Sequence, residues 1–209
     1  MGAKWFGASV KRKEDPALLT GRGRYVDDIK LSGMLYAVVL RSPHGHAGIR
    51  GIDKTAALAM PGVHAVFTYA DLPESMRRQT VPLLVPSPTI KQVFMPYCLA
   101  KDEVCFVGEP VAIVVADSRY LAEDAAALVD VDYEVLPAVS DPAKGLAASA
   151  PMAHRTSPNN LAAFIPINVG NTDAAFAQAA HVFRQKIFQH RGGPVFTECR
   201  GMIAVPDVV

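Results

Sequence analysis

This chain lacks an excess of charge of either sign. Its 209 residues include 21 basic and 20 acidic side chains, which gives a formal net charge of +1. Without a basic field there is no electrostatic reason to expect binding to nucleic acid or to anionic lipid. Aromatic residues make up only 8% of the sequence, so a surface that stacks nucleobases is not expected either. Nucleic acid is therefore not an expected partner.

Long apolar runs are also missing. No segment approaches the roughly 18 consecutive apolar residues that a membrane span requires. The N-terminal stretch MGAKWFGASVKRKEDP has no apolar centre of the kind found in secretory signals. We therefore expect a cytoplasmic protein without a membrane span.

Cysteine is scarce. The chain contains Cys98, Cys105 and Cys199, and none of them belongs to a C-x-x-C pair. An odd number without paired spacing argues against a disulfide framework and against a four-cysteine zinc or iron–sulfur site. Cys105 lies between Val104 and Phe106, and we interpret it as a small core residue.

The clearest structural pattern lies between Phe106 and Val139, with the sequence FVGEPVAIVVADSRYLAEDAAALVDVDYEVLPAV. The apolar, β-branched run from Val111 to Ala116 predicts a strand that is buried on both faces. The pair Asp117-Ser118 can cap the helix that follows. Val131 to Val135 alternates between apolar and polar residues, which is typical of a half-exposed strand. The segment therefore predicts a strand, a helix and a second strand.

Further elements are expected on both sides of this unit. Four more strands are predicted, at residues 34–41, 63–68, 181–190 and 195–205. Asp53 and Thr172 are each expected to cap a short helix. Because strands and helices alternate irregularly and the loops differ greatly in length, the pattern indicates the α+β class rather than a regular βαβ series.

Two histidines are candidates for a metal site. His44 and His46 would lie on one face of a strand, but Pro43 and Gly45 make this segment a loop. The other histidines are scattered, at positions 64, 154, 181 and 190. No third ligand is recognisable, so we predict no metal-binding residue. A small-molecule enzyme that uses these histidines is the weakest of the functions considered.

Two other groups of polar residues were candidates for chemistry. Asp130, Asp132 and Glu134 alternate along one strand, which is typical of a solvated or partner-facing edge rather than of an acid–base pair in unequal environments. The run HRGGPVFTECRG, residues 190–201, places charged side chains around a Gly-Gly-Pro turn. It fits either a segment near an anionic cofactor or a domain seam, or else a salt-bridged hairpin.

Five blocks of sequence, taken in their order and spacing, resemble one known family. They are EDPALLTGRGRYVDDI (14–29), MLYAVVLRSPHGHAGIRGID (34–53), PGVHAVFTYADLP (61–73), the 106–139 segment and TECRGMIA (197–204). Together they are similar to the N-terminal part of the large, molybdenum-binding subunit of the xanthine dehydrogenase, aldehyde oxidase and carbon monoxide dehydrogenase family. The proline-rich region 74–96 matches least.

The resemblance implies a domain order and a reaction. The expected parts are an N-terminal arm (1–19), an α/β hammerhead domain (20–140), a linker (141–164) and the first strands of a molybdopterin-binding domain (165–209). The family oxidises aldehydes, N-heterocycles or carbon monoxide at a molybdenum–pterin cofactor. FAD and [2Fe–2S] clusters in partner subunits or domains carry the electrons away.

The resemblance carries over no catalytic, cofactor-binding or metal-binding residue. The family's Gly-rich cofactor loop, its substrate-pocket loop and its catalytic glutamate all lie downstream of the part that this sequence matches. Glu198 matches a structural glutamate in the family's E-x-R-G run. The candidates for a domain seam are therefore Arg191, Glu198, Arg200 and Gly201.

The sequence departs from the family pattern at three positions. Gly45 and Gly48 stand where larger residues are usual, and Cys199 stands where proline is usual. We expect these substitutions to loosen the backbone.

We therefore expect a structural or interface portion of a molybdenum hydroxylase-type oxidoreductase, which is not catalytic alone and binds no cofactor by itself. Its expected partners are the cofactor-bearing remainder of the large subunit and the FAD and iron–sulfur subunits, in an oligomer. The alternative is a stand-alone binding or assembly module without redox activity.

Overall fold

The computed structural model describes residues 7–82, 87–190, 192–193, 195–196 and 198–206. The chain divides into two compact units. The larger unit runs from Leu35 to Ala177, and the smaller unit combines Met1–Met34 with Gln178–Val209.

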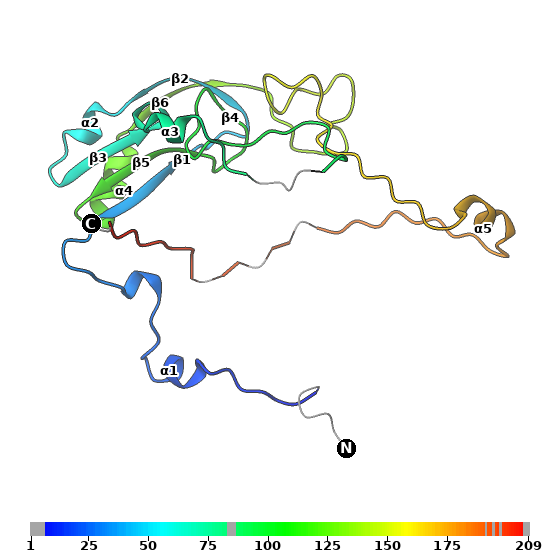
Figure 1. The fold of residues 1–209 in the computed structure, drawn as a ribbon, viewed down its shortest axis with the longest axis horizontal. Helices are drawn as coiled ribbons and strands as arrows, with labels where there is room; N and C mark the ends of the chain where they lie inside the picture. Colours follow the sequence, from blue (N-terminus) through cyan, green and yellow to red (C-terminus); the bar gives the residue numbers. More distant parts are fainter. Residues whose placement is uncertain (1–6, 83–86, 191, 194, 197, 207–209) are drawn as a thin grey trace. The chain divides into compact units, whose positions relative to one another are not determined.

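The larger unit contains two antiparallel three-stranded sheets (Figure 1). The first sheet has the order β1 (Tyr36–Arg41), β5 (Pro110–Ala116), β3 (Val63–Thr68). The second has the order β4 (Glu103–Val104), β2 (Ala47–Asp53), β6 (Asp130–Val135). Each sheet therefore joins strands that are far apart in the sequence, and both sheets draw on the N-terminal and the C-terminal half of the unit.

Strand β5 explains the apolar run in the sequence. It lies between β1 and β3, and Val111 and Val114 are both fully buried. Val114 packs in a cluster with Val66 and with alanines from two helices, whereas Val111 packs in a second cluster with Ala47 and Val104. The predicted strand buried on both faces is confirmed, and this strand contributes to both hydrophobic clusters.

Helix α4 (Arg119–Ala127) begins as predicted. The Ser118 hydroxyl accepts a hydrogen bond from the backbone N–H of Leu121, which satisfies one of the free donors of the first turn. The helix packs on β1 and β5 with alanine side chains, and Ala122 and Ala125 are fully buried. Such small side chains let the helix axis lie close to the sheet.

The remaining helices are short. They are α1 (Asp15–Leu19), η1 (Val26–Asp28), α2 (Thr55–Leu58), η2 (Tyr69–Asp71), α3 (Glu74–Arg77) and α5 (Thr172–Gln178). Among the residues that the structure describes, no helix combines the length and the apolar character that crossing a membrane requires.

Both predicted capping residues are displaced by one position. The Asp53 carboxylate accepts a hydrogen bond from the Thr55 N–H at 2.9 Å, but Lys54 occupies the N-cap position of α2 and makes no side-chain cap, so the prediction of Asp53 as the cap is wrong by one residue. At α5 the prediction is also wrong by one residue. Asn171 is the cap, because its side-chain oxygen accepts from the Ala174 N–H at 3.0 Å, while Thr172 already belongs to the helix.

The strands predicted at 181–190 and 195–205 are wrong for the residues that the structure describes there. These residues have irregular backbone instead. A strand requires a hydrogen-bonded neighbour, and the described residues of this chain supply none for these segments. The α+β class itself is confirmed by the two antiparallel sheets and the helix packed on one of them.

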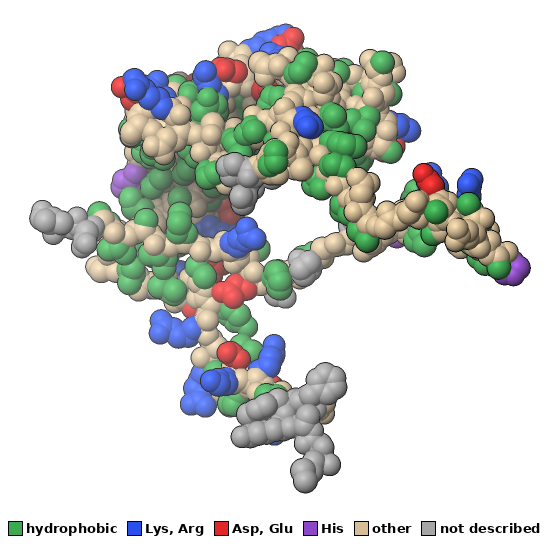
Figure 2. Space-filling view, turned by 45° about the vertical axis from the view of Figure 1, so that its right-hand side comes forward, with side chains coloured by type: hydrophobic (Ala, Val, Ile, Leu, Met, Phe, Trp, Pro, Cys, Tyr) green, Lys and Arg blue, Asp and Glu red, His purple; other side chains and the backbone are tan. Residues whose placement is uncertain are grey.

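Charged side chains do not gather by sign on the molecular face drawn in Figure 2. Basic and acidic groups are interspersed there with hydrophobic side chains. This distribution agrees with the formal net charge of +1 and leaves no strong field on that face to attract a highly charged partner.

The position of β5 leads to a stability prediction. Val114→Ala should lower the free energy of unfolding by about 2 kcal/mol, because it removes buried methyl groups and leaves a cavity between sheet and helix. Val135→Ala is the matched control, because Val135 lies in a strand but is 64% exposed, and its effect should stay within about 0.5 kcal/mol. Urea unfolding of both variants is the measurement, and equal losses would show that β5 is not the centre of the core.

Candidate functional site

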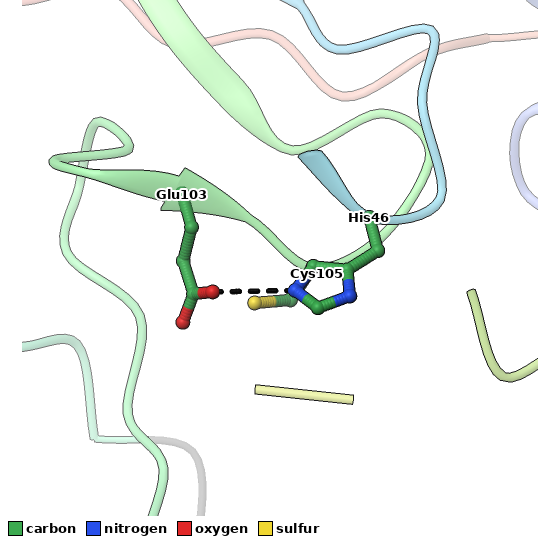
Figure 3. A group of neighbouring side chains, drawn as sticks. All are labelled: His46, Glu103 and Cys105. Atoms are coloured by element: carbon green, nitrogen blue, oxygen red, sulfur yellow. Dashed lines mark hydrogen bonds and ion pairs between the residues drawn. The ribbon is translucent and has the colours of Figure 1, made fainter. Parts of the chain in front are cut away.

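His46 is a buried imidazole in the loop immediately before β2. It is 5% exposed. Its Nδ1 lies 3.2 Å from the carbonyl oxygen of Pro137, and its Nε2 lies 3.2 Å from Oε2 of Glu103 (Figure 3). A carbonyl oxygen can only accept a hydrogen bond, so Nδ1 carries a proton and donates a hydrogen bond to the carbonyl oxygen of Pro137. The other ring nitrogen, Nε2, faces the Glu103 carboxylate.

Glu103 and Cys105 reach this place through a very short strand. The pairing of β4 with β2 joins Ala47 to Val104 and Gly48 to Glu103. This register places Glu103 beside the start of β2, where His46 lies. The ligand atoms of His46, Glu103 and Cys105 all lie within 4.8 Å of one another.

His154 approaches the same place from the segment that follows β6. Its Nδ1 lies 3.1 Å from the sulfur of Cys105 and 4.0 Å from Oε1 of Glu103. The imidazole stacks on Phe94, with ring centroids 4.2 Å apart and an angle of 7° between the planes. The four side chains are called the histidine–cysteine cluster below. Its members are His46, Glu103, Cys105 and His154.

The environment of Cys105 keeps it protonated. Burial, together with the nearby carboxylates of Glu103 and Glu109, raises the pKa of the thiol to about 12. Burial also lowers the pKa of His154, so its imidazole is neutral at neutral pH. A reactive cysteine needs a thiolate beside a positive group, and this pair is a thiol beside a neutral ring. The arrangement therefore gives no support to nucleophilic catalysis by Cys105.

Glu109 is a buried carboxyl group that contacts the backbone of the cluster at Cys105. Its Oε2 accepts a hydrogen bond from the backbone N–H of Cys105 at 2.6 Å. Burial raises the pKa of Glu109, and the backbone hydrogen bonds that its carboxylate accepts act in the opposite direction. The contact fixes the backbone at Cys105 and thus the direction of its side chain.

The sequence interpretation of these residues needs correction. Cys105 is not a small core residue, because it is only partly buried and its thiol contacts His154. His44 does not share a site with His46, since its ring packs edge-on against Tyr133 at a centroid distance of 4.8 Å. The cluster could not be recognised from spacing, because its members come from three separate segments.

A second polar arrangement lies at Gly48. An added Cβ at this position would lie 2.1 Å from Nη2 of Arg155, so the guanidinium occupies the space that a side chain would fill. Arg155 Nη2 donates to Oε2 of Glu134 at 2.7 Å and, with Arg50, lowers the pKa of Glu134. This glycine therefore makes room for an ion pair, and the expectation that it loosens the backbone stays a prediction.

The neighbouring acidic residues differ from one another. Glu134 is ion-paired, whereas Asp130 and Asp132 are exposed and line a shallow depression with Asp53. The alternating carboxylates thus do not form one uniform edge. A partner-facing role for Asp130 and Asp132 stays a prediction.

The candidate domain-seam residues lie in the smaller unit. Oε1 of Glu198 accepts a hydrogen bond from the Val26 N–H at 3.1 Å. A Cβ at Gly201 would lie 2.2 Å from the Val26 side chain, so this position also packs tightly against Val26. Arg200 is exposed, and Arg191 lies outside the described residues. Glu198 and Gly201 therefore both lie against Val26. Their role at a domain seam stays a prediction.

The larger unit has two antiparallel sheets with a helix packed on one of them, and comparison with known proteins defines the family. Residues 20–137 match the family model described as the α/β hammerhead domain of aldehyde oxidase and xanthine dehydrogenase. The chain therefore belongs to the aldehyde oxidase and xanthine dehydrogenase family.

Individual relatives agree with this assignment. The chain is 41% identical to the nicotine 6-hydroxylase large subunit of Paenarthrobacter nicotinovorans over 199 residues, which cover 95% of this chain and 24% of that protein. It is 38% identical to the carbon monoxide dehydrogenase large chain of Afipia carboxidovorans, with 98% and 26% covered. The chain spans about a quarter of the length of the curated relatives that it matches.

Solved structures show the same relationship. The Cu,Mo-containing carbon monoxide dehydrogenase in its carbon monoxide reduced state matches with a TM-score of 0.64 and 38% identity, covering 84% of this chain and 23% of that one. The aldehyde oxidoreductase of Desulfovibrio gigas matches with a TM-score of 0.68 and 32% identity, covering 81% and 19%.

The contact between Gly48 and Arg155 can be tested by a double-mutant cycle. Gly48→Ala should destabilise the protein more in the presence of Arg155 than in an Arg155→Ala background, because the new methyl group displaces the guanidinium from Glu134. Gly51→Ala is the matched control, since a Cβ there meets no atom within 4 Å. Its effect should add to that of Arg155→Ala. Urea unfolding measures both couplings, and additivity at Gly48 would refute the contact.

Proposed function

We propose that this chain supplies the α/β hammerhead part of the molybdenum-binding large subunit of a molybdenum hydroxylase-type oxidoreductase. Its role is structural: it packs against the cofactor-bearing part and performs no chemistry alone. The observation that carries the proposal is the hammerhead match over residues 20–137 in a chain that spans about a quarter of its large-subunit relatives. The substrate of the complete enzyme would be an aldehyde, an N-heterocycle or carbon monoxide.

Two surface depressions of the larger unit do not fit a molybdopterin cofactor. Such a cofactor carries an anionic phosphate, which requires positive groups or free backbone N–H donors. One surface depression is lined by three carboxylates, those of Asp53, Asp130 and Asp132. In another, the guanidinium of Arg155 is already paired with Glu134. The proposal therefore places the cofactor on another part of the enzyme.

Exposed apolar side chains of the smaller unit support a packing role. Phe183, Phe188 and Val195 are 89%, 76% and 97% exposed. Large apolar groups that lie open in one short stretch are typical of a surface that another protein part covers. We propose the remainder of the large subunit as the occupant, since the relatives include a xanthine dehydrogenase molybdenum-binding subunit. FAD and iron–sulfur subunits complete the proposed oligomer, and a cytoplasmic location stays a prediction.

Affinity purification of the tagged chain from its native cells tests this function. We expect a larger subunit and molybdenum to co-purify with the chain. The isolated chain should contain no stoichiometric molybdenum and should oxidise neither aldehydes, N-heterocycles nor carbon monoxide. Molybdenum is measured by mass spectrometry of the eluted metal.

Two variants locate the contact. Phe188→Asp should abolish co-purification, because it places a charge in the apolar stretch that the partner covers. Tyr120→Asp is the matched control, since Tyr120 is 78% exposed on the first turn of α4 and should retain the partner. Recovery of wild-type chain without any partner would instead support a stand-alone module. Molybdenum-dependent oxidation by the isolated chain would refute the structural role.

A further inference from the structure

We propose that the histidine–cysteine cluster binds a zinc ion, which fastens the segment that follows β6 onto the β4–β2–β6 sheet. The site does not rest on the proposed function, because all of its ligands belong to the larger unit of this chain.

The ligand types are those that zinc prefers. The cluster offers one thiol sulfur, two imidazole nitrogens and one carboxylate oxygen. Four protein ligands in a tetrahedral arrangement are characteristic of structural zinc sites, and a sulfur ligand argues against calcium and magnesium. With Cys105 as thiolate and Glu103 ionised, the two negative charges balance the charge of Zn²⁺. A neutral assembly is the form in which such groups can be buried at low cost.

The distances are close to those of a tetrahedral site. Zinc–nitrogen bonds of about 2.0 Å and zinc–sulfur bonds of about 2.3 Å place neighbouring ligand atoms about 3.3 to 3.6 Å apart. The observed separations are 3.2 Å for His46 and Glu103, 3.1 Å for Cys105 and His154, and 4.0 Å for His154 and Glu103. His46 and His154 face different oxygens of the Glu103 carboxylate, so binding of one ion by all four side chains requires these side chains to adjust.

The hydrogen bonds of His46 prepare it as a ligand. Because Nδ1 donates to the Pro137 carbonyl, the ring presents its other nitrogen, Nε2, to the Glu103 carboxylate. Two acceptor atoms that face each other at 3.2 Å require a proton or a cation between them. A zinc ion bound to both atoms satisfies this requirement. The backbone N–H of Arg155, which donates to Oε2 of Glu103 at 3.2 Å, further orients the carboxylate.

Zinc binding releases two protons from the cluster. The Cys105 S–H bond breaks, and the proton held between His46 Nε2 and the Glu103 carboxylate is displaced. Both protons leave to solvent, and the electron pairs of the sulfur, of Nε2 and of the carboxylate oxygen then bind zinc. The ion then joins the loop before β2, the end of β4 and the segment around His154. The pairing of β4 with β2 and the polar contacts of Arg155 with Glu103 and Glu134 also link these parts. The ion thus adds a cross-link where the sheet is narrowest.

Metal titration of the full 209-residue chain tests the site. The chain is purified without chelator and its zinc content is measured. The metal is then removed, and Co²⁺ is added as a spectroscopic probe. We expect one zinc per chain, and with cobalt a thiolate-to-metal charge-transfer band together with the intense visible bands of tetrahedral coordination. Zinc should also raise the unfolding temperature of the metal-free chain.

Ligand variants separate this site from adventitious binding. Cys105→Ser should lose the charge-transfer band, and both Cys105→Ser and His154→Ala should weaken zinc binding by roughly 100-fold or more. His154 is partly exposed and lies outside both sheets, so His154→Ala keeps the test valid if Cys105→Ser fails to fold. The matched controls Cys98→Ser and His64→Ala remove the same groups outside the cluster and should bind as the wild type does.

Two results would overturn the proposal. The first is a wild-type chain that binds zinc or cobalt no more tightly than Cys105→Ser or His154→Ala. In that case the cluster is a hydrogen-bonded network with a proton between His46 and Glu103. The second is equal loss of binding in the control variants, which would show that the metal is held elsewhere.

Discussion

The burial of strand β5 on both of its faces is the constraint on which the larger unit depends. Val114 faces a cluster shared with Val66, and Val111 faces a cluster shared with Ala47 and Val104. A single seven-residue strand therefore links the core beneath α4 to the core beneath the second sheet. Because both clusters include this strand, neither α4 nor the second sheet can shift relative to β5 without opening apolar contacts.

In the second sheet, the same apolar packing determines where the polar side chains of the histidine–cysteine cluster lie. Strand β4 contributes only Glu103 and Val104, and its register with β2 is fixed because Val104 must be buried beside Ala47. The alternation of side chains in a strand then turns Glu103 away from that core and toward His46. The polar cluster is therefore a direct result of an apolar contact one residue away.

The sequence predicted elements well wherever burial is periodic. The strand at 63–68 has the predicted bounds, and Ser118 caps α4 as expected, because apolar alternation and capping are local properties. The cluster at His46 was not predicted, since its members lie up to 108 positions apart and only strand pairing brings them together. The strand predictions for segments 181–190 and 195–205 also failed because strand formation depends on distant residues. Their residues favour strands, but a strand also needs a partner that local composition does not supply.

The space above Gly48 has a consequence for how such a chain can change over generations. A side chain at position 48 would take the space that the guanidinium of Arg155 occupies. The arginine side chain is flexible and can move aside, but it then loses its place beside Glu134. Related sequences should therefore vary at these two positions as a correlated pair. The residue type of Gly48 alone suggests a loose backbone. In three dimensions, this glycine leaves the space that the guanidinium of Arg155, 107 residues further along the chain, occupies.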